Sequence, residues 1–208
     1  FVQLYFVYYV DIIYTVSQIH NNSIVLMGCK HCGKSTQGRI IAQKLGCKFF
    51  DTDDVIKRFS GIDVRDYYKQ NGASVFMQLE ERVCKKIIDK NKGQQIVIST
   101  GGGVCENPPA LSILRECETF VFLRLDIKYS VERIMRNVVQ MAPYQFKNVP
   151  AYVLEKEPET LKDVSDILFQ KYEQRYNLYQ VIADEVVDIK NAPIEENSKL
   201  IFEALGIN

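Results

Sequence analysis

Nine residues near the start of the chain, GCKHCGKST from Gly28 to Thr36, have the types and spacing to bind a phosphate. The glycines let backbone N–H groups turn toward an anion, and Lys34 follows at the position that reaches terminal phosphates. An apolar run, SIVLM, precedes this stretch and a helical period follows it, so the positive end of a new helix adds to the site. We therefore predict a nucleotide site, with candidate binding residues Gly28, Cys32, Gly33, Lys34, Ser35 and Thr36. In such loops the hydroxyl corresponding to Ser35 binds Mg²⁺.

The same loop contains a second pattern, the C-x-x-C of Cys29 to Cys32. Helix starts lower the pKa of cysteine thiols, so a redox pair is one alternative. A disulfide would, however, constrain the loop that a phosphate needs. Metal binding by Cys29, His31 and Cys32 is a weaker alternative, because these side chains would diverge around a bound phosphate.

Acidic residues follow the next apolar run, in the stretch FFDTDD. A carboxylate just past a strand and beside a phosphate loop is where Mg²⁺ and an acceptor hydroxyl need acidic partners. A helix cap by Asp53 or Asp54 would explain one of these residues but not the cluster. We favour functional roles for Asp51 and Asp53.

Three glycines, Gly101 to Gly103, end the clearest central strand, QQIVIST. Glycines at such a point indicate that a group approaches the backbone closely or that φ must be positive. A plain loop would explain them if they stood alone. Because the other two motifs are also present, we favour the interpretation that a ligand or side chain approaches the backbone of these glycines closely.

From residue 22 onward the sequence alternates between β-rich runs and segments of helical period, and the motifs lie at their junctions. This alternation predicts an α/β fold with a mostly parallel sheet. Residues 77–90 have Leu79, Val83, Cys84, Ile87 and Ile88 at helical spacing, and 159–184 have Leu161, Val164, Leu168 and Tyr172 in phase. Gly46 and Gly61 are the expected helix stops. Residues 138–160 show little period, so we expect a mobile loop with fragments of helix.

Composition is that of a soluble globular domain, with 47% hydrophobic and 25% charged residues in a chain of 208. Lysine plus arginine and aspartate plus glutamate balance at 26 each, so no charge excess indicates a nucleic-acid or membrane partner. The six cysteines do not resemble a disulfide framework, and free thiols in a reducing cytoplasm explain them better.

The first 21 residues form a separate unit in this interpretation, an N-terminal extension of uncertain structure. They are rich in Tyr, Val, Phe and Ile, but Asp11 and several other polar residues interrupt them. A transmembrane span needs about 20 nearly unbroken apolar residues, and a signal peptide needs a basic start. We expect an accessory strand or helix that packs on the domain.

Taken in order and spacing, the three motifs resemble the shikimate kinase family, a branch of the P-loop kinases. The stretches VFMQLEE, QRYNLY and ADEVVDI resemble further segments of that family, so the resemblance covers residues 22–208. It implies a three-layer α/β/α P-loop kinase fold with a five-stranded parallel sheet. It also implies ATP and Mg²⁺ as cofactors, a small-molecule acceptor and transfer of the γ-phosphate to a ring hydroxyl.

The resemblance assigns roles by position. It implies that Lys34 is catalytic, that Ser35 and Asp51 serve the metal, and that Asp53 binds and polarises the acceptor hydroxyl. The implied acceptor-binding residues are Asp53, Glu80, Gly101, Gly102, Gly103 and Arg175. Arg175 would pair with the acceptor carboxylate, although an ordinary ion pair with Glu173 or Asp184 is the alternative.

Two family arginines are missing. The family has arginine where this chain has Met77, to grip the shikimate carboxylate, and its lid has arginine where this chain has Ala142. Losing one partner of a buried charge pair costs about 2–5 kcal/mol. Efficient use of shikimate would therefore need a substitute cation, such as Arg58, Arg65 or Lys147.

The lid's catalytic charge has candidates on the preceding helix. We take Arg136 as the candidate catalytic cation, with Arg133 beside it, and a solvated helix face as the alternative. The sequence thus predicts a cytoplasmic, monomeric shikimate-kinase-like enzyme. A kinase for a less anionic acceptor and a non-catalytic ATP-binding regulatory module remain as alternatives.

Overall fold

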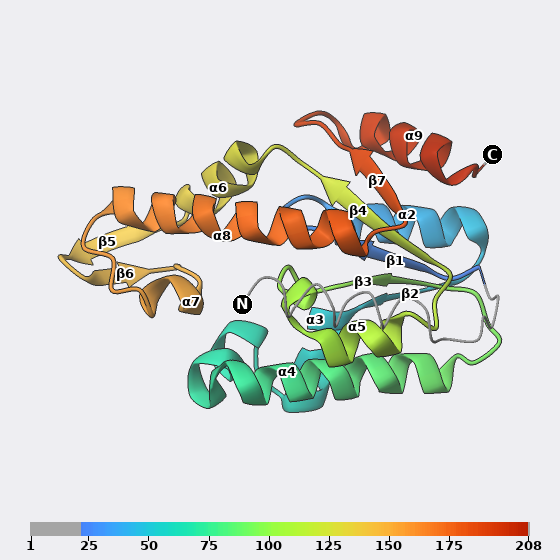
Figure 1. Cartoon of the computed structure of the whole chain (residues 1–208), viewed down its shortest axis with the longest axis horizontal. Coiled ribbons are helices and arrows are strands. Elements are labelled where there is room, and N and C mark those ends of the chain that lie inside the picture. Colours follow the sequence, from blue (N-terminus) through green and yellow to red (C-terminus); the bar gives the residue numbers. More distant parts are fainter. Residues whose placement is uncertain (1–21, 208) are drawn as a thin grey trace.

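Five short strands form an all-parallel sheet in the computed structural model, which describes residues 22–207 (Figure 1). The order across the sheet is β2-β3-β1-β4-β7. The strands are β1 (Ile24–Met27), β2 (Lys48–Asp51), β3 (Ile96–Ser99), β4 (Thr119–Arg124) and β7 (Glu185–Asp188). The central strands β1 and β3 are buried along their whole length, as continuous apolar runs in parallel sheets are when helices cover both faces. The predicted α/β class and five-stranded parallel sheet are confirmed.

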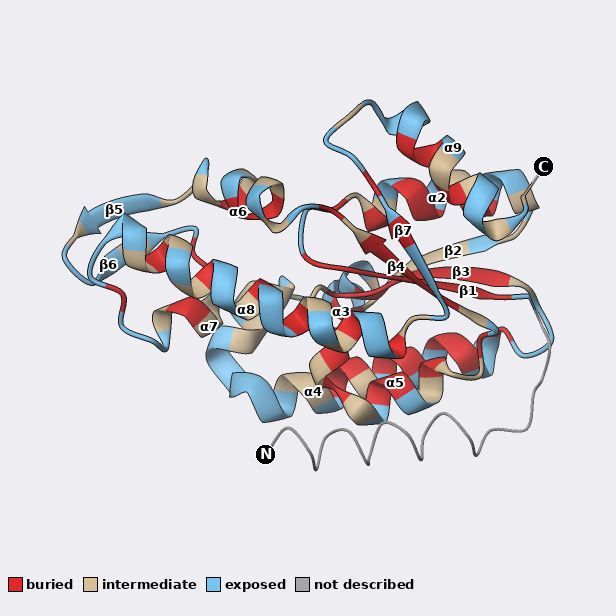
Figure 2. Ribbon diagram, turned by 45° about the horizontal axis from the view of Figure 1, so that its top comes forward, coloured by how far each residue is buried: buried red, intermediate tan, exposed pale blue. Residues whose placement is uncertain are grey.

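Helices cover both faces of this sheet and make it the middle of three layers (Figure 2). Successive strand residues point to opposite faces, so the strands divide their side chains between two cores. Val25 and Met27 join a core built with α4 (Val64–Lys90), α5 (Pro108–Leu114) and α8 (Leu161–Ile182). Ile24 and Leu26 join a second core with α2 (Lys34–Leu45) and α9 (Ile194–Leu205).

Glycines end two of the helices at the predicted stops. Gly46 follows α2 with φ 66°, and Gly61 follows α3 (Thr52–Ser60) with φ 77°. In both cases the backbone takes the left-handed conformation that glycine adopts without steric cost.

The helix expected over residues 77–90 begins earlier, because α4 starts at Val64 and contains an interruption at Gly72, with φ 76° and ψ 174°. The interruption breaks the helical period of the sequence, so the periodic pattern does not predict the first part of α4. The five apolar residues noted at helical spacing are all buried. The long helix expected over 159–184 is confirmed as α8, in which Val164, Leu168 and Tyr172 are buried and Leu161, in the first turn, is 40% exposed.

The segment 138–160 is more regular than expected. It contains an antiparallel hairpin of β5 (Val139–Ala142) and β6 (Gln145–Lys147), followed by the short helix α7 (Ala151–Leu154). Pro143 and Tyr144 form the turn, and the φ of 63° at Tyr144 suits the second central position of a type II turn. The hairpin was missed because its strands are short and mostly exposed, so they lack an apolar alternation.

The remaining elements are a short 3₁₀ turn, η1 (Val104–Glu106), and the helix α6 (Ile127–Met135). Within residues 22–207, no helix combines the length and apolar character that crossing a membrane requires. The prediction for residues 1–21 lies outside the described residues.

Candidate active site

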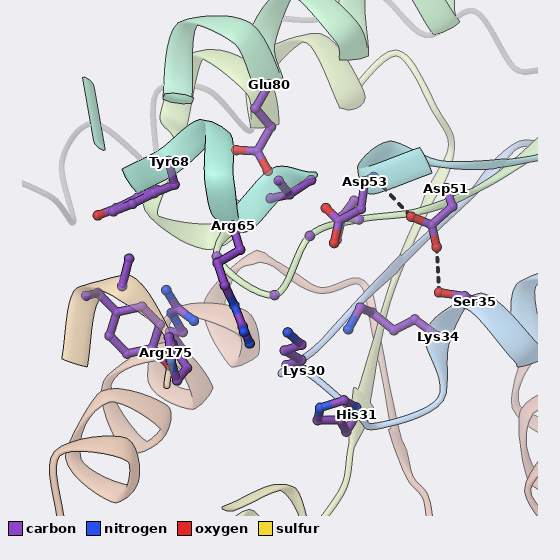
Figure 3. A pocket seen from close by; sticks show the side chains of 18 of the residues that line it. Lys30, His31, Lys34, Ser35, Asp51, Asp53, Arg65, Tyr68, Glu80 and Arg175 are labelled. Carbon is purple, nitrogen blue, oxygen red and sulfur yellow. Dashed lines mark hydrogen bonds between the residues drawn. The ribbon is translucent and has the colours of Figure 1, made fainter. Parts of the chain in front are cut away.

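One cavity of about 600 Å³ opens at the carboxyl ends of β1, β2 and β3, where loops of parallel sheets usually hold ligands. It brings together residues from all three sequence motifs, and Figure 3 shows side chains of the first two. The predicted site residues that line it are Gly33, Lys34, Ser35, Thr36, Asp51, Asp53, Glu80, Gly101, Gly102, Gly103 and Arg175. Residues far apart in the sequence therefore share one space.

The phosphate loop ends at a helix start that is left open to an anion. Gly33 has φ 96° at the start of α2, and no side chain of the described residues caps that helix. The first turn of α2 contains no acidic residue, so its N–H groups and positive end are available to a phosphate. The Lys34 ammonium donates to the Cys29 carbonyl at 2.9 Å, which holds it inside the loop. This arrangement fits the phosphates of ATP.

Asp51 connects the phosphate loop to the next helix. Its Oδ2 accepts a hydrogen bond from Ser35 Oγ at 2.5 Å, and its Oδ1 accepts one from the Asp53 backbone N–H at 3.0 Å. The second bond caps α3, so the cap is Asp51, not Asp53 or Asp54 as the alternative interpretation had it. The Asp53 side chain therefore has no capping duty.

Ser35 and Asp51 offer a hydroxyl and a carboxylate, the hard oxygen donors that suit Mg²⁺. Among residues 22–207 there is no group of three His, Cys, Asp or Glu side chains that would hold a metal by itself. A site on this pair therefore needs further ligands from the nucleotide and from water, as Mg²⁺ in phosphoryl-transfer enzymes does.

Two carboxylates face the glycine turn from either side. Protein packed around Asp53 raises the pKa of its carboxyl, and Asp51 adds to the rise while Lys34 opposes it. Asp53 is nonetheless solvent-exposed and lines the cavity, so its carboxylate can contact a ligand. Burial raises the pKa of Glu80 from 4.5 to about 7, although a hydrogen bond from Asn107 at 2.8 Å works against it.

Each glycine of the GGG turn is in close contact with a different part of the site. A Cβ on Gly101 would stand 3.1 Å from Asp53 Oδ1 and 3.2 Å from Glu80 Oε1. A Cβ on Gly102 would stand 3.0 Å from the Lys30 backbone nitrogen, and one on Gly103 would stand 3.1 Å from Arg175 Nη2. Side chains larger than hydrogen would push these groups apart, which explains the three glycines physically.

Arg175 is buried at the other end of the cavity and has a partner that neither alternative named. Its guanidinium donates to Glu106 Oε2 from Nε at 3.2 Å and from Nη2 at 2.9 Å. Lys171 reaches the other oxygen of Glu106 at 2.5 Å, while Asp184 pairs with Arg115 instead. Arg175 therefore lines the cavity with much of its charge already balanced.

Three predicted site residues do not line the cavity. Arg136 is exposed at the end of α6, whereas Arg133, one turn earlier, lines the cavity and donates to the His31 carbonyl at 2.5 Å. Cys32 is buried beneath the loop. Gly28 shapes the loop from below, since its φ is 144° and a Cβ there would stand 2.8 Å from the Leu123 carbonyl oxygen.

The two cysteines of the C-x-x-C pattern belong to different cores. Cys29 packs with the α4 and α8 core and Cys32 with the α2 and α9 core. Burial raises the pKa of the Cys29 thiol well above its usual range, which suppresses the reactive thiolate. The arrangement favours the phosphate-loop interpretation over the redox one.

Several cavity residues were not singled out as site residues from the sequence. They include Lys30, Tyr68 and Tyr152, while His31 had been named only as a possible metal ligand and Arg65 as a possible substitute cation. Lys30 and His31 occupy the variable positions of the loop motif, which the motif does not constrain. Tyr68 and Tyr152 come from segments whose placement depends on tertiary packing, so no local pattern marks them.

Comparisons with known proteins agree with this geometry. A family model described as shikimate kinase matches residues 30–206. The shikimate kinase of Francisella tularensis subsp. holarctica is 30% identical over 177 residues, covering 85% of this chain and 90% of the relative. The crystal structure of shikimate kinase from Aquifex aeolicus aligns with a TM-score of 0.65 at 28% identity, covering 88% of this chain and 96% of that one. A shikimate kinase from Acinetobacter baumannii in complex with shikimate has the same fold, with a TM-score of 0.69 at 24% identity over 89% and 94% of the two chains.

Proposed function

This chain belongs to the shikimate kinase family, whose members are ATP-dependent phosphotransferases, and from that premise we propose that it phosphorylates a ring hydroxyl of shikimate itself. The observation that carries the proposal is a single cavity shared by the phosphate loop and the acceptor side. Lys34 and Asp53 point into it from the first turns of α2 and α3 (Figure 3). Phosphoryl transfer depends mainly on positioning and charge stabilisation, and both are built into this arrangement.

On this proposal the phosphate loop holds the nucleotide. The open first turn of α2 and the Lys34 ammonium bind the β- and γ-phosphates, and Lys34 exchanges the Cys29 carbonyl for a phosphate oxygen. Ser35 and Asp51 would hold Mg²⁺, which neutralises charge on the phosphates when bound. Ser35 and Asp51, the two residues of the metal site, are already joined by a hydrogen bond.

Asp53 acts on the acceptor. Its carboxylate accepts a hydrogen bond from the reacting hydroxyl and takes the proton as the oxygen attacks the γ-phosphorus, while the bond to the ADP oxygen breaks. The raised pKa of Asp53 makes it a better proton acceptor than an ordinary aspartate. Lys34, close enough to lower that pKa, stabilises the charge that develops on the transferred group.

The cavity charges support an anionic acceptor over a less anionic one. Met77 is not among the residues that line the cavity, whereas five basic residues do line it, namely Lys30, Lys34, Arg65, Arg133 and Arg175. A non-catalytic module is not favoured either, because such a module has no need of Asp53 and the GGG turn beside its nucleotide site.

We further propose a monomer that works in the cytoplasm. The free state of all six cysteines supports a reducing compartment. Light scattering of the purified full chain measures the oligomeric state, and a dimer would contradict the proposed monomer.

The function is tested by incubating the chain with MgATP and shikimate and following ADP release together with the phosphorylated acid. Turnover that requires both substrates supports the proposal. ATP binding without turnover on shikimate, in a chain that is folded by circular dichroism, would refute it. Asp53→Asn keeps the shape of the side chain, and it is expected to lower kcat by about a hundredfold or more because the proton acceptor is lost.

A further inference from the structure

We propose that Arg65 binds the carboxylate of the acceptor and so replaces the arginine that position 77 lacks. The inference rests on the proposed function and deepens it by assigning acceptor specificity to one side chain. Arg65 stands on α4, on the acceptor side of the cavity, and its guanidinium reaches toward Lys30 of the phosphate loop (Figure 3).

Among the residues that the structure describes, none is a hydrogen-bond or ion-pair partner of Arg65. Within residues 22–207 it makes no hydrogen bond and no ion pair with another side chain. Its side chain stands between the main cavity and a smaller hollow of about 290 Å³, so solvent space lies on both sides of it. An arginine with five donors that points into a cavity and meets no protein acceptor is suited to a ligand oxyanion.

The helix itself gives no reason for a cation at this point. Arg65 lies in the first turn of α4, two residues after the flanking Asp63. The positive end of a helix disfavours positive side chains there. Helix stability therefore does not explain an arginine at this position.

A second cation, Lys30, lies close to Arg65 in the cavity. Burial lowers the pKa of Lys30, and the Arg65 guanidinium lowers it further, which shows that the two positive charges are close. Asp53 is the nearby acid that opposes this effect. Two cations that repel each other across a cavity gain when an anion binds between them, and this anion would lie next to the carboxylate that handles the acceptor hydroxyl.

The other candidate cations are less suitable. Arg58 is exposed on α3 and does not line the cavity, and Lys147 lines a separate hollow under the hairpin. Arg175 lines the cavity, but Glu106 takes two of its hydrogen bonds. Arg65 is thus the substitute that the geometry selects.

The test compares Arg65→Ala and Arg65→Lys with Arg58→Ala, which removes an arginine of the same region outside the cavity. Initial rates are measured with ATP and with shikimate, each varied in turn. We expect Arg65→Ala to raise the KM for shikimate by about thirtyfold or more while the KM for ATP stays within about twofold. Arg65→Lys should fall between the two, because lysine keeps the charge but lacks the planar fork. Arg58→Ala should match the wild type.

A second measurement reports what Arg65 touches and does not require turnover. Calorimetry compares binding of shikimate with binding of its carboxamide analogue, which has no negative charge. The wild type should prefer the acid, and Arg65→Ala should lose most of that preference, a result that a merely structural role would not produce.

Three outcomes would overturn the inference. They are a shift confined to the KM for ATP, an acid-over-amide preference unchanged in Arg65→Ala, and a wild type that binds the amide as well as the acid. The proposed function fails separately, when the wild type does not phosphorylate shikimate, whatever the calorimetry reports.

Discussion

The two halves of the cavity are built in different ways. The phosphate half comes from nine consecutive residues, Gly28–Thr36, and presents mostly backbone donors at the start of α2. The acceptor half comes from side chains of α3, α4, the GGG turn, α7 and α8. A contiguous backbone site leaves few alternatives at each position, whereas a site assembled from several elements allows one element to supply a charge that another has lost. On our proposal, Arg65 and Met77 are an example of the second kind, because the break at Gly72 separates them into two segments of α4.

The largest expected effect tests the phosphate half. Lys34→Ala should lower kcat/KM by about a hundredfold to a thousandfold, because it removes the ammonium at the start of α2 that would stabilise the developing charge. Steady-state kinetics measures the loss, and Lys44→Ala, in the last turn of the same helix, is the matched control. Near-normal turnover by Lys34→Ala would remove the basis for the whole comparison.

The acceptor half should show a pH-dependent stability that depends on Glu80. The pKa of this buried carboxyl is raised from 4.5 to about 7, so the folded chain keeps the proton over a range in which the unfolded chain has lost it. Stability contributed by the neutral form is therefore present below pH 4.5 and is lost as the pH rises to about 7, a change of about 3 kcal/mol.

Glu80→Gln removes this titration. The free energy of unfolding of the variant, measured by urea denaturation, should gain on that of the wild type from pH 4.5 to pH 7 and then stay level. Glu173→Gln, exposed on α8, is the control. A constant difference between Glu80→Gln and the wild type over this range would contradict the prediction.

Two glycine substitutions compare the halves directly. Gly28→Ala should lower the free energy of unfolding by about 1–3 kcal/mol, because its φ is 144° and the new Cβ would stand 2.8 Å from a backbone oxygen. Gly103→Ala should cost about 1 kcal/mol or less, because its close neighbour is the end of the Arg175 side chain, which can move. Thermal unfolding measures both, and equal losses would show that the two halves are equally rigid.

The smallest effect concerns the arginines of α6. Arg133 donates to the His31 carbonyl and to Asn191, and His31 is held at a positive φ of 66°. We expect Arg133→Ala to raise the KM for ATP by about tenfold, since a hydrogen bond from a charged group contributes about 1.5 kcal/mol. Arg136→Ala, outside the cavity, should leave it unchanged. The reverse order would restore Arg136 as the cation that assists the phosphate half.

The same contrast explains what the sequence could and could not predict. The strands, the phosphate loop and the buried face of α4 follow from local patterns, so a reading of Gly28–Thr36 and of Leu79–Ile88 leads to the observed structure. The hairpin of β5 and β6 carries no apolar alternation, and the break at Gly72 interrupts a period that would otherwise have marked α4 from Val64.

Partners in the acceptor half depend on tertiary packing. Arg175 lies 69 positions from Glu106 in the sequence, and nothing near either residue indicates that they meet. Whether Arg133 or Arg136 reaches the cavity depends on how α6 is rotated about its axis and on where it ends. A small change in that rotation decides which of two arginines one turn apart lines the cavity. Local sequence gives the correct helix but not the correct residue.

Asp51 has a consequence that reaches across the site. Its two oxygens join the hydroxyl of Ser35 to the first turn of α3, and α3 leads into the segment that carries Arg65. A metal–nucleotide complex held by Ser35 and Asp51 would also affect the hydrogen bond to Asp51 that caps α3. Binding linkage is reciprocal, so whatever factor the nucleotide applies to acceptor affinity, the acceptor applies to nucleotide affinity in return.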